Sequence, residues 1–159
     1  MVRHLRDGDL PALQTIRAAA FAPIFASFRE LVGAEIAGAA LKSAEAEQSA
    51  LLETLCQPEP CRRVLVAALD SGPVGFCSAR VEPEQRLGEI ELNAVHPDHA
   101  GLGIGSRLIG AALQWLKNQG AEVATVGTGA DPSHAAARRA YQKVGFGPAI
   151  PSIYLYKRL

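Results

Sequence analysis

Hydrophobic and polar residues follow two different repeats along the chain, and these repeats predict its helices and strands. Alternation with a period of two, or a short apolar run between turn residues, indicates strands at residues 2–5, 63–69, 74–81, 89–95, 122–126 and 153–156. Apolar residues spaced three to four apart indicate helices at residues 9–21 and 108–120. The content of Ala, Glu, Leu and Lys indicates a helical region at residues 27–55, and Asp131-Pro132 caps a helix that ends at about residue 143. This mixture of helices and strands predicts an α/β fold.

Glycine and proline residues mark where these elements end. Pro23 is expected to interrupt or kink the first helical segment, and Gly33 or Gly38 to break the second. The turn at residues 70–73 joins two strands into a hairpin. Since no internal repeat or linker divides the chain, residues 1–159 are expected to form a single domain of ordinary size.

Net charge, apolar runs and cysteine content indicate which class of partner and which cellular compartment the sequence favours. Lys and Arg together number 16, as do Asp and Glu, so no overall field favours nucleic acid or an anionic membrane as a partner. The first residues lack the apolar core of a signal peptide, and no run of about 18 apolar residues occurs, which favours a cytoplasmic protein. Cys56, Cys61 and Cys77 are interpreted as reduced thiols, although Cys56 and Cys61 are close enough in sequence to bridge.

A glycine-rich segment follows the strand expected at residues 89–95. Pro97 stops that strand, and Gly101, Gly103 and Gly105 then allow the backbone to turn tightly where the next helix begins. Backbone N–H groups at a helix start favour a bound phosphate, by about 0.3–2 kcal/mol per charge. The segment therefore predicts either a pyrophosphate cradle or a turn that binds nothing. The segment does not match the dinucleotide-binding fingerprint, because the third glycine is missing. It does not match the P-loop either, because no Gly-Lys pair follows.

Two motifs resemble those of the GNAT N-acetyltransferase superfamily. Residues 100–105, Ala-Gly-Leu-Gly-Ile-Gly, follow Val-His-Pro at residues 95–97 and are similar to the family's acetyl-CoA signature, Arg/Gln-x-x-Gly-x-Gly/Ala. Ala100 departs from it, because the family has Arg or Gln there. Residues 133–146 are similar to the family's Asn-x-x-Ala-x-x-x-Tyr-x-x-x-Gly-Phe, with His134 where Asn is usual. The resemblance covers most of the chain.

The resemblance implies the GNAT fold, a mixed and mostly antiparallel central sheet flanked by helices, with acetyl-CoA as the acetyl donor. It implies that the strand end at residues 93–95 pairs with the pantetheine arm and stabilises the oxyanion, and that Tyr141 protonates the departing thiolate. Alternatively, Tyr141 is a buried residue bonded to backbone, and His134 is either a cofactor donor or a helix-start histidine. The expected cofactor contacts are Asn93, Ala94, Val95, Ala100, Gly101, Leu102, Gly103, Ile104, Gly105, Ser106, His134, Arg138 and Tyr141.

Two glutamates before the glycine segment are candidates for the general base, because an amine of lysine-like pKa must lose a proton before it attacks. Glu89, Glu91 and Asn93 alternate, so they are expected on one strand face. By resemblance, Glu89 lies where some histone-acetylating members carry their general base, and Glu91 is the second candidate. Either glutamate could instead bind a cationic substrate or face solvent. The run His96-Pro97-Asp98-His99 is a weak metal signal, and no metal is expected.

These observations favour an acetyl-CoA-dependent N-acetyltransferase that moves the acetyl group directly to a primary amine. The acceptor, a small-molecule or peptide amine, is identified by no motif, and the segment at residues 27–55 is expected either to line its site or only to pack. The alternative function is an acyl-CoA-binding or regulatory module without turnover, suggested by the departures at Ala100 and His134. The oligomeric state is open, with a homodimer as one option.

Overall fold

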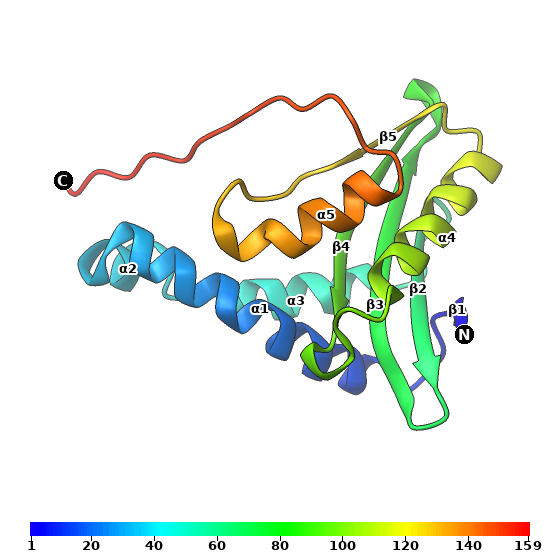
Figure 1. The fold of residues 1–159 in the computed structure, drawn as a ribbon, viewed down its shortest axis with the longest axis horizontal. Coiled ribbons are helices and arrows are strands. Elements are labelled where there is room, and N and C mark those ends of the chain that lie inside the picture. The colour runs from blue at the N-terminus through cyan, green and yellow to red at the C-terminus, as the bar shows by residue number, and fades with distance from the viewer.

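The computed structural model describes residues 1–159 and places a central sheet between two layers of helices (Figure 1). The strands are β1 Val2–His4, β2 Arg62–Leu69, β3 Gly72–Glu82, β4 Leu87–Val95 and β5 Val123–Val126. The helices are α1 Leu10–Val32, α2 Ala34–Ala40, α3 Ala44–Leu55, α4 Ile104–Asn118 and α5 Ala135–Lys143. Short 3₁₀ turns lie at Pro83–Gln85, Pro97–His99 and Pro132–His134.

The sheet contains five strands in the order β1-β2-β3-β4-β5. The first three pairings are antiparallel, and the hairpin predicted between β2 and β3 is present. β4 and β5 are parallel, and α4 connects them. Parallel neighbours need such a crossover, because a hairpin turn only reverses the chain. The predicted mixed and mostly antiparallel sheet is therefore confirmed.

Each face of the sheet packs against its own helices. On one face, α4 contributes Leu108 and Leu116 to a core that also contains part of α5. On the other face, α1 and α3 contribute Leu13 and Leu52, which pack with Phe76 of β3. This arrangement follows from the apolar stripes of the helices, which must each find an apolar sheet face. None of the helices combines the length and the apolar character that spanning a bilayer requires.

A β-bulge in β4 reverses which residues face each layer. The register between β3 and β4 shifts at Glu91, which is an extra residue without a partner on β3. Ile90 before the bulge packs in the α4 core, whereas Leu92 after it packs in the α1 core. Glu89 and Asn93 therefore lie on opposite faces of the sheet. The prediction that Glu89, Glu91 and Asn93 share one face is wrong, because simple alternation does not anticipate a bulge.

α1 continues through Pro23, so the predicted interruption there is wrong. Proline removes only one N–H donor, and packing holds the helix beyond it, where Phe25 is buried and lies 6.4 Å from the Phe21 ring. Gly33, with a φ of +80°, separates α1 from α2 as predicted. Gly38 lies inside α2 and does not break it, because its conformation there is helical.

The strand predicted at residues 153–156 is absent. Residues 147–159, called the arm from here on, have no regular secondary structure and are exposed. The arm runs past α5 toward the end of the molecule where α2 lies (Figure 1). A strand needs a neighbour for its N–H and C=O groups, and none lies beside the arm. The alternating sequence signals a strand but not where its partner lies.

Candidate active site

A cavity of about 530 Å³, called the cleft from here on, lies where β4 and β5 separate. β5 pairs with β4 only from Leu87 to Ile90, so residues 91–95 have no strand neighbour on that side. The walls of the cleft come from α1, the end of β4, the glycine segment and α5, and therefore from both sheet faces. The predicted site residues that border it are Glu91, Asn93, Ala94, Val95, Ala100, Gly101, Gly103, Ile104, Gly105, Ser106, His134 and Tyr141.

The glycine segment forms one end of the cleft. Gly101 and Gly103 have φ angles of +77° and +73°, a left-handed conformation that glycine adopts without strain. A Cβ atom at either position would meet no atom within 4 Å, so the space beside both is open. α4 begins at Ile104, earlier than the start predicted at Leu108, because the two glycines complete the turn before it.

The first turn of α4 presents three backbone donors to the cleft. The first backbone bond of this helix runs from Arg107 N–H to Gly103 C=O at 3.1 Å, so the N–H groups of Ile104, Gly105 and Ser106 precede it. No acidic side chain lies in this turn. Free N–H groups and the positive end of the helix dipole together form a site for a phosphate.

The free edge of β4 adds further backbone groups. His96 N–H donates to Val74 C=O on β3 at 2.9 Å. Because backbone groups alternate in direction along a strand, those of Asn93 and Val95 point away from β3, toward the cleft. An extended ligand chain can therefore hydrogen-bond along this edge as another strand would.

Tyr141 has its ring in the core and its hydroxyl at the cleft. The ring meets Phe146 edge-on at 5.7 Å, and the Asn93 amide donates to the hydroxyl oxygen. Burial raises the pKa of Tyr141 to about 12, although the bond from Asn93 opposes this shift. The hydroxyl is thus bonded to a side chain rather than to backbone, and its proton remains available to a ligand.

Glu91 borders the cleft from the bulge and is held by several partners. Arg62 Nε donates to it at 2.9 Å, Ser78 Oγ donates at 2.7 Å, and Arg80 Nε lies 3.6 Å away. Glu89 pairs with Arg80 at 3.2 Å and does not border the cleft. Of the two predicted carboxylates, only Glu91 reaches the cleft.

His134 borders the cleft at the start of α5, where Asp131 fixes its ring. Nδ1 lies 2.7 Å from Asp131 Oδ1, and the ring stacks on Phe28 of α1 at 5.6 Å. Burial raises the pKa of Asp131, but hydrogen bonds from Ser133 and His134 lower it by more, so it lies below its usual value. Arg138 donates to carbonyls of the loop before α5 and does not border the cleft.

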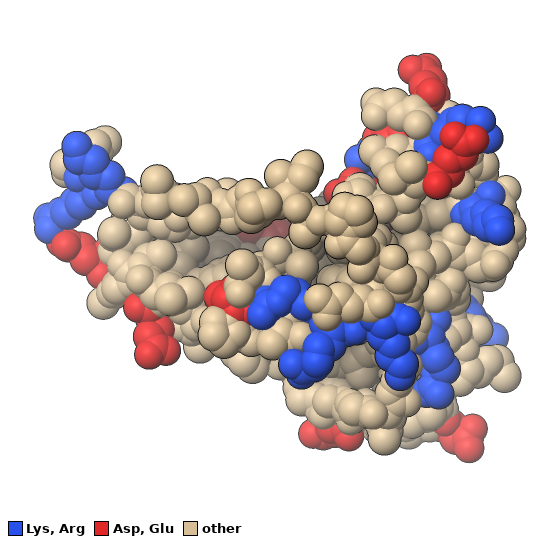
Figure 2. Space-filling view, turned by 45° about the horizontal axis from the view of Figure 1, so that its top comes forward, with Lys and Arg blue, Asp and Glu red and all other residues tan.

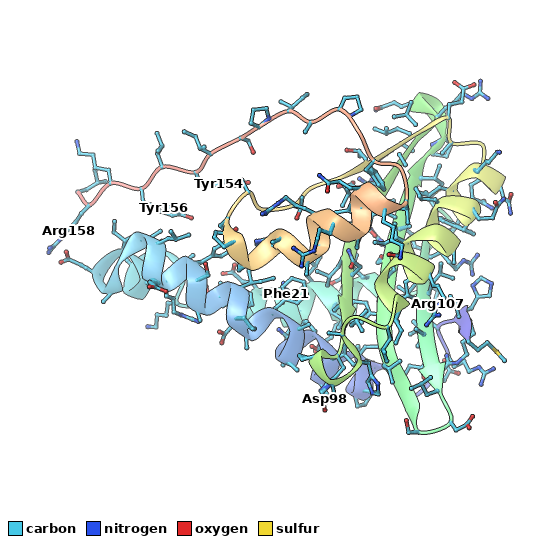
Figure 3. All side chains as sticks on the ribbon, in the orientation of Figure 1. Phe21, Asp98, Arg107, Tyr154, Tyr156 and Arg158 are labelled. Atoms are coloured by element: carbon cyan, nitrogen blue, oxygen red, sulfur yellow. The ribbon has the colours of Figure 1, made fainter.

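The cleft also contains residues that the motifs did not identify. α5 contributes Arg139 and Lys143, one turn apart, and neither is part of an ion pair. Figure 2 shows a band of Lys and Arg side chains over α5 and the start of α4. Phe21 of α1 lies across the cleft (Figure 3), and Ile24 of the same helix also lines it. The spacing of the two cations signals a basic helix face, but no sequence pattern places α1 opposite it. Leu102 is exposed outside the cleft.

Neither a metal cluster nor a reactive thiol lies at this site. No three His, Cys, Asp or Glu side chains are arranged to hold a metal ion. His96 Nδ1 instead accepts from Asp98 N–H at 3.3 Å and closes the 3₁₀ turn. The cysteines are free, and burial raises the pKa of the Cys77 thiol to about 12. Because no cysteine borders the cleft, nothing suggests a covalent acetyl-enzyme.

Comparison with known proteins assigns the chain to a family. The model of the acetyltransferase (GNAT) family matches residues 28–146, which contain the whole of β4, α4, β5 and α5. The chain belongs to the GNAT acetyltransferase family. The resemblance carried by the two motifs is therefore confirmed.

Two mycothiol acetyltransferases are among the relatives of this GNAT chain. The protein of Streptomyces coelicolor is 35% identical over 81 residues, which cover 51% of this chain and 26% of that protein. The protein of Sanguibacter keddieii is 34% identical over 96 residues, which cover 57% of this chain and 30% of that protein. The chain thus matches less than a third of the length of either relative.

Solved structures share the fold over the whole chain. An aminoglycoside N-acetyltransferase in complex with CoA has a TM-score of 0.66 and 18% identity, with 100% of both chains covered. An aminoglycoside 6'-N-acetyltransferase from Acinetobacter haemolyticus has a TM-score of 0.69 and 16% identity, with 100% of this chain and 99% of that chain covered. At such identities the likeness establishes the GNAT fold.

Proposed function

We propose that this GNAT chain transfers an acetyl group from acetyl-CoA directly to a primary amine. The observation that carries the proposal is the cleft, where the free edge of β4 meets the free N–H groups at the start of α4. The side beside α5 suits the donor, and the side beside α1 suits the acceptor. Because both sides belong to one cleft, the donor and the acceptor can bind together and the reacting groups can meet without an intermediate on the protein.

The α5 side of the cleft offers backbone groups that can bind the phosphates and the pantetheine chain of the donor. The N–H groups at the start of α4 suit the pyrophosphate, and the edge of β4 at Asn93 and Val95 suits the pantetheine amides. Ala100 lacks the Arg or Gln side chain of the family signature, and with it one side-chain contact to the cofactor. Arg139 and Lys143 border the same cleft as free cations and supply the charge that Ala100 cannot.

The transfer places negative charge first on the thioester oxygen and then on the sulfur. A backbone N–H at the free edge of β4 stabilises the oxygen. The Tyr141 hydroxyl interacts with the departing sulfur, but the pKa of Tyr141, about 12, lies well above the value of about 8.5 of an ordinary thiol. Complete proton transfer to a thiolate of that basicity would be uphill by about 5 kcal/mol. Tyr141 therefore acts mainly as a hydrogen-bond donor to the sulfur in the transition state.

Glu91 interacts with the acceptor amine rather than with acetyl-CoA. Glu91 borders the cleft, but Arg62 and Ser78 already occupy its oxygens, so it does not take up the proton itself. Its negative charge attracts the ammonium group of the acceptor, and a water molecule carries the proton away. Glu89 is the weaker candidate for a general base, because it pairs with Arg80 and does not border the cleft.

The acceptor side favours a small cationic molecule. Glu91 supplies negative charge there, and Phe21 and Ile24 supply an apolar wall. The similar proteins are named for mycothiol and for aminoglycosides, both small molecules, which supports this class over a protein amine.

Release of free thiol from acetyl-CoA in the presence of an amine panel tests the proposed function. The panel contains polyamines, aminoglycosides, amino acids and a lysine peptide. We expect thiol release with at least one small cationic amine, and none with a Gly103→Asp variant, whereas Gly147→Asp on the arm behaves as the unmodified protein. CoA binding without thiol release for any amine would contradict the proposal and support a binding module without turnover, the function that Ala100 suggests.

A further inference from the structure

The α1 side of the cleft has an apolar lining. The residues that line it there are Ala20, Phe21 and Ile24 of α1, with Leu92 and Ala94 of β4. Leu92 and Ala94 belong to the core between the sheet and α1, and Phe21 lies between α1 and α5 (Figure 3). Such walls favour the apolar part of a small molecule, because its binding removes both surfaces from water.

One carboxylate, that of Glu91, opens onto this apolar lining. Ser78 pairs with Leu92 in the register of β3 and β4, so their side chains share the sheet face that carries α1. Because Ser78 Oγ donates to Glu91 at 2.7 Å, the Glu91 carboxylate reaches the same face. No other Asp or Glu lines the cleft. An ammonium group on the α1 side therefore has a single anionic partner.

Glu91 keeps negative charge despite its two arginine neighbours, because those arginines are shared. Arg62 and Arg80 contact four carboxylates between them, those of Glu59, Glu82, Glu89 and Glu91. Of the four, only Glu91 borders the cleft. The excess of negative charge in this network therefore attracts one further cation, and the place open to it is beside Glu91.

A second ammonium group on the same molecule would find no such partner. Asp131 belongs to the loop before α5, but it is bonded to Ser133 and His134 and does not line the cleft. Arg139 and Lys143 do line it, and as cations they repel an ammonium group. Because an unpaired charge against apolar walls is costly, each additional positive charge weakens binding. The lining therefore selects against polycations.

We propose that the acceptor is a primary amine with one ammonium group on an apolar alkyl or arylalkyl chain. The ammonium group lies at Glu91, and the apolar chain lies along Phe21 and Ile24. This inference rests on the proposed function, because it names the class of amine that the same cleft acetylates. Transfer breaks the C–S bond of acetyl-CoA, forms a C–N bond to the amine and yields an N-alkylacetamide, free CoA thiol and one proton. Aminoglycosides carry several ammonium groups, so they fall outside this class.

Hexylamine and hexamethylenediamine test the inference, because they have equal chain length and differ only in a second ammonium group. Titration into the protein saturated with CoA measures their binding without turnover. We expect hexylamine to bind about 5- to 150-fold more tightly, the ratio for one charged group left without a partner. Butylamine should bind about two- to fourfold more weakly for each methylene it lacks. Equal or tighter binding of the diamine, or no binding of hexylamine, would overturn the inference.

A carboxylate added to the α1 wall should reduce this preference. Ile24→Glu offers a partner to the second ammonium group, so the diamine should gain about tenfold or more relative to hexylamine. Ala22→Glu adds the same charge at an exposed position of α1 that does not line the cleft, and it should keep the original ratio. An unchanged ratio in a folded Ile24→Glu protein would overturn the inference.

Thiol release from acetyl-CoA with the same amines separates this inference from the proposed function. Release with hexylamine, but not with hexamethylenediamine or an aminoglycoside, supports both. Release with the diamine or an aminoglycoside alone overturns the inference and upholds the proposed function. Preferential binding of hexylamine without thiol release from any amine overturns the proposed function and upholds the binding site.

Discussion

Replacing Tyr141 with phenylalanine removes one hydroxyl from the cleft and keeps the ring that packs in the core. The residue is only 6% exposed, and phenylalanine retains its edge contact with Phe146. The protein bond that is lost comes from Asn93, and such a bond contributes about 1 kcal/mol to stability. We therefore expect Tm to fall by about 2–4 °C and the Kd for acetyl-CoA to change little.

The effect of Tyr141→Phe on turnover should be much larger. A hydrogen bond to a charged group contributes about 1.5–3 kcal/mol, so losing it from the departing sulfur lowers kcat about 10- to 150-fold. The assay is thiol release at saturating acetyl-CoA with an accepted amine. Tyr154→Phe on the arm is the matched control and should keep full turnover. An unchanged kcat, or a loss of affinity that accounts for the whole effect, would refute the role of the hydroxyl.

The raised pKa of Tyr141 gives the same variant a second readout. The folded protein holds this proton up to about pH 12, whereas the unfolded chain releases it near pH 10. The unfolded state thus binds fewer protons in this range, so stability falls as the pH rises from 10 to 12. Tyr141→Phe should lack this part of the fall. Denaturant unfolding at pH 9 to 12 compares the two proteins, and identical slopes would contradict the raised pKa.

Other substitutions test the remaining parts of the cleft. Gly103→Asp should abolish acetyl-CoA binding in a titration while the protein still melts cooperatively, because a negative side chain enters the phosphate site; tight binding by the folded variant contradicts the cradle. Arg139→Ala with Lys143→Ala should weaken acetyl-CoA binding about 5- to 30-fold, from about 1–2 kcal/mol for two exposed charges, and Ala100→Arg should restore most of it. Unchanged affinity in the double variant would remove both cations from the donor site. Glu91→Gln should raise the amine KM about tenfold with an unchanged Kd for acetyl-CoA, and an equal loss for both substrates would show that it acts through the fold.

The parts of the site that depend on consecutive residues could be predicted from the sequence. Gly101 and Gly103 adopt the left-handed conformation that the glycine segment implied, and α4 starts beside them. Tyr141 lies in α5 and His134 in the 3₁₀ turn directly before it, and both reach the cleft. In each case the local backbone decides the position of the group, and no distant contact is needed to know it.

The parts that depend on distant contacts could not be predicted. The bulge at Glu91 arises from the register of β4 against β3, and it moved Glu89 away from Asn93. α1 passes through Pro23 because packing around Phe25 outweighs the lost N–H donor. The strand expected in the arm likewise depends on an edge elsewhere in the sheet, which the alternating pattern does not specify.

The central claim is that the glycine segment and the free edge of β4 hold acetyl-CoA despite the alanine at position 100. Isothermal titration of the unmodified protein with acetyl-CoA tests it most directly, with CoA and NADH titrated beside it. The account predicts micromolar or tighter binding of acetyl-CoA and CoA, and none of NADH. Absence of acetyl-CoA binding would contradict it and would show that the glycine segment is only a turn.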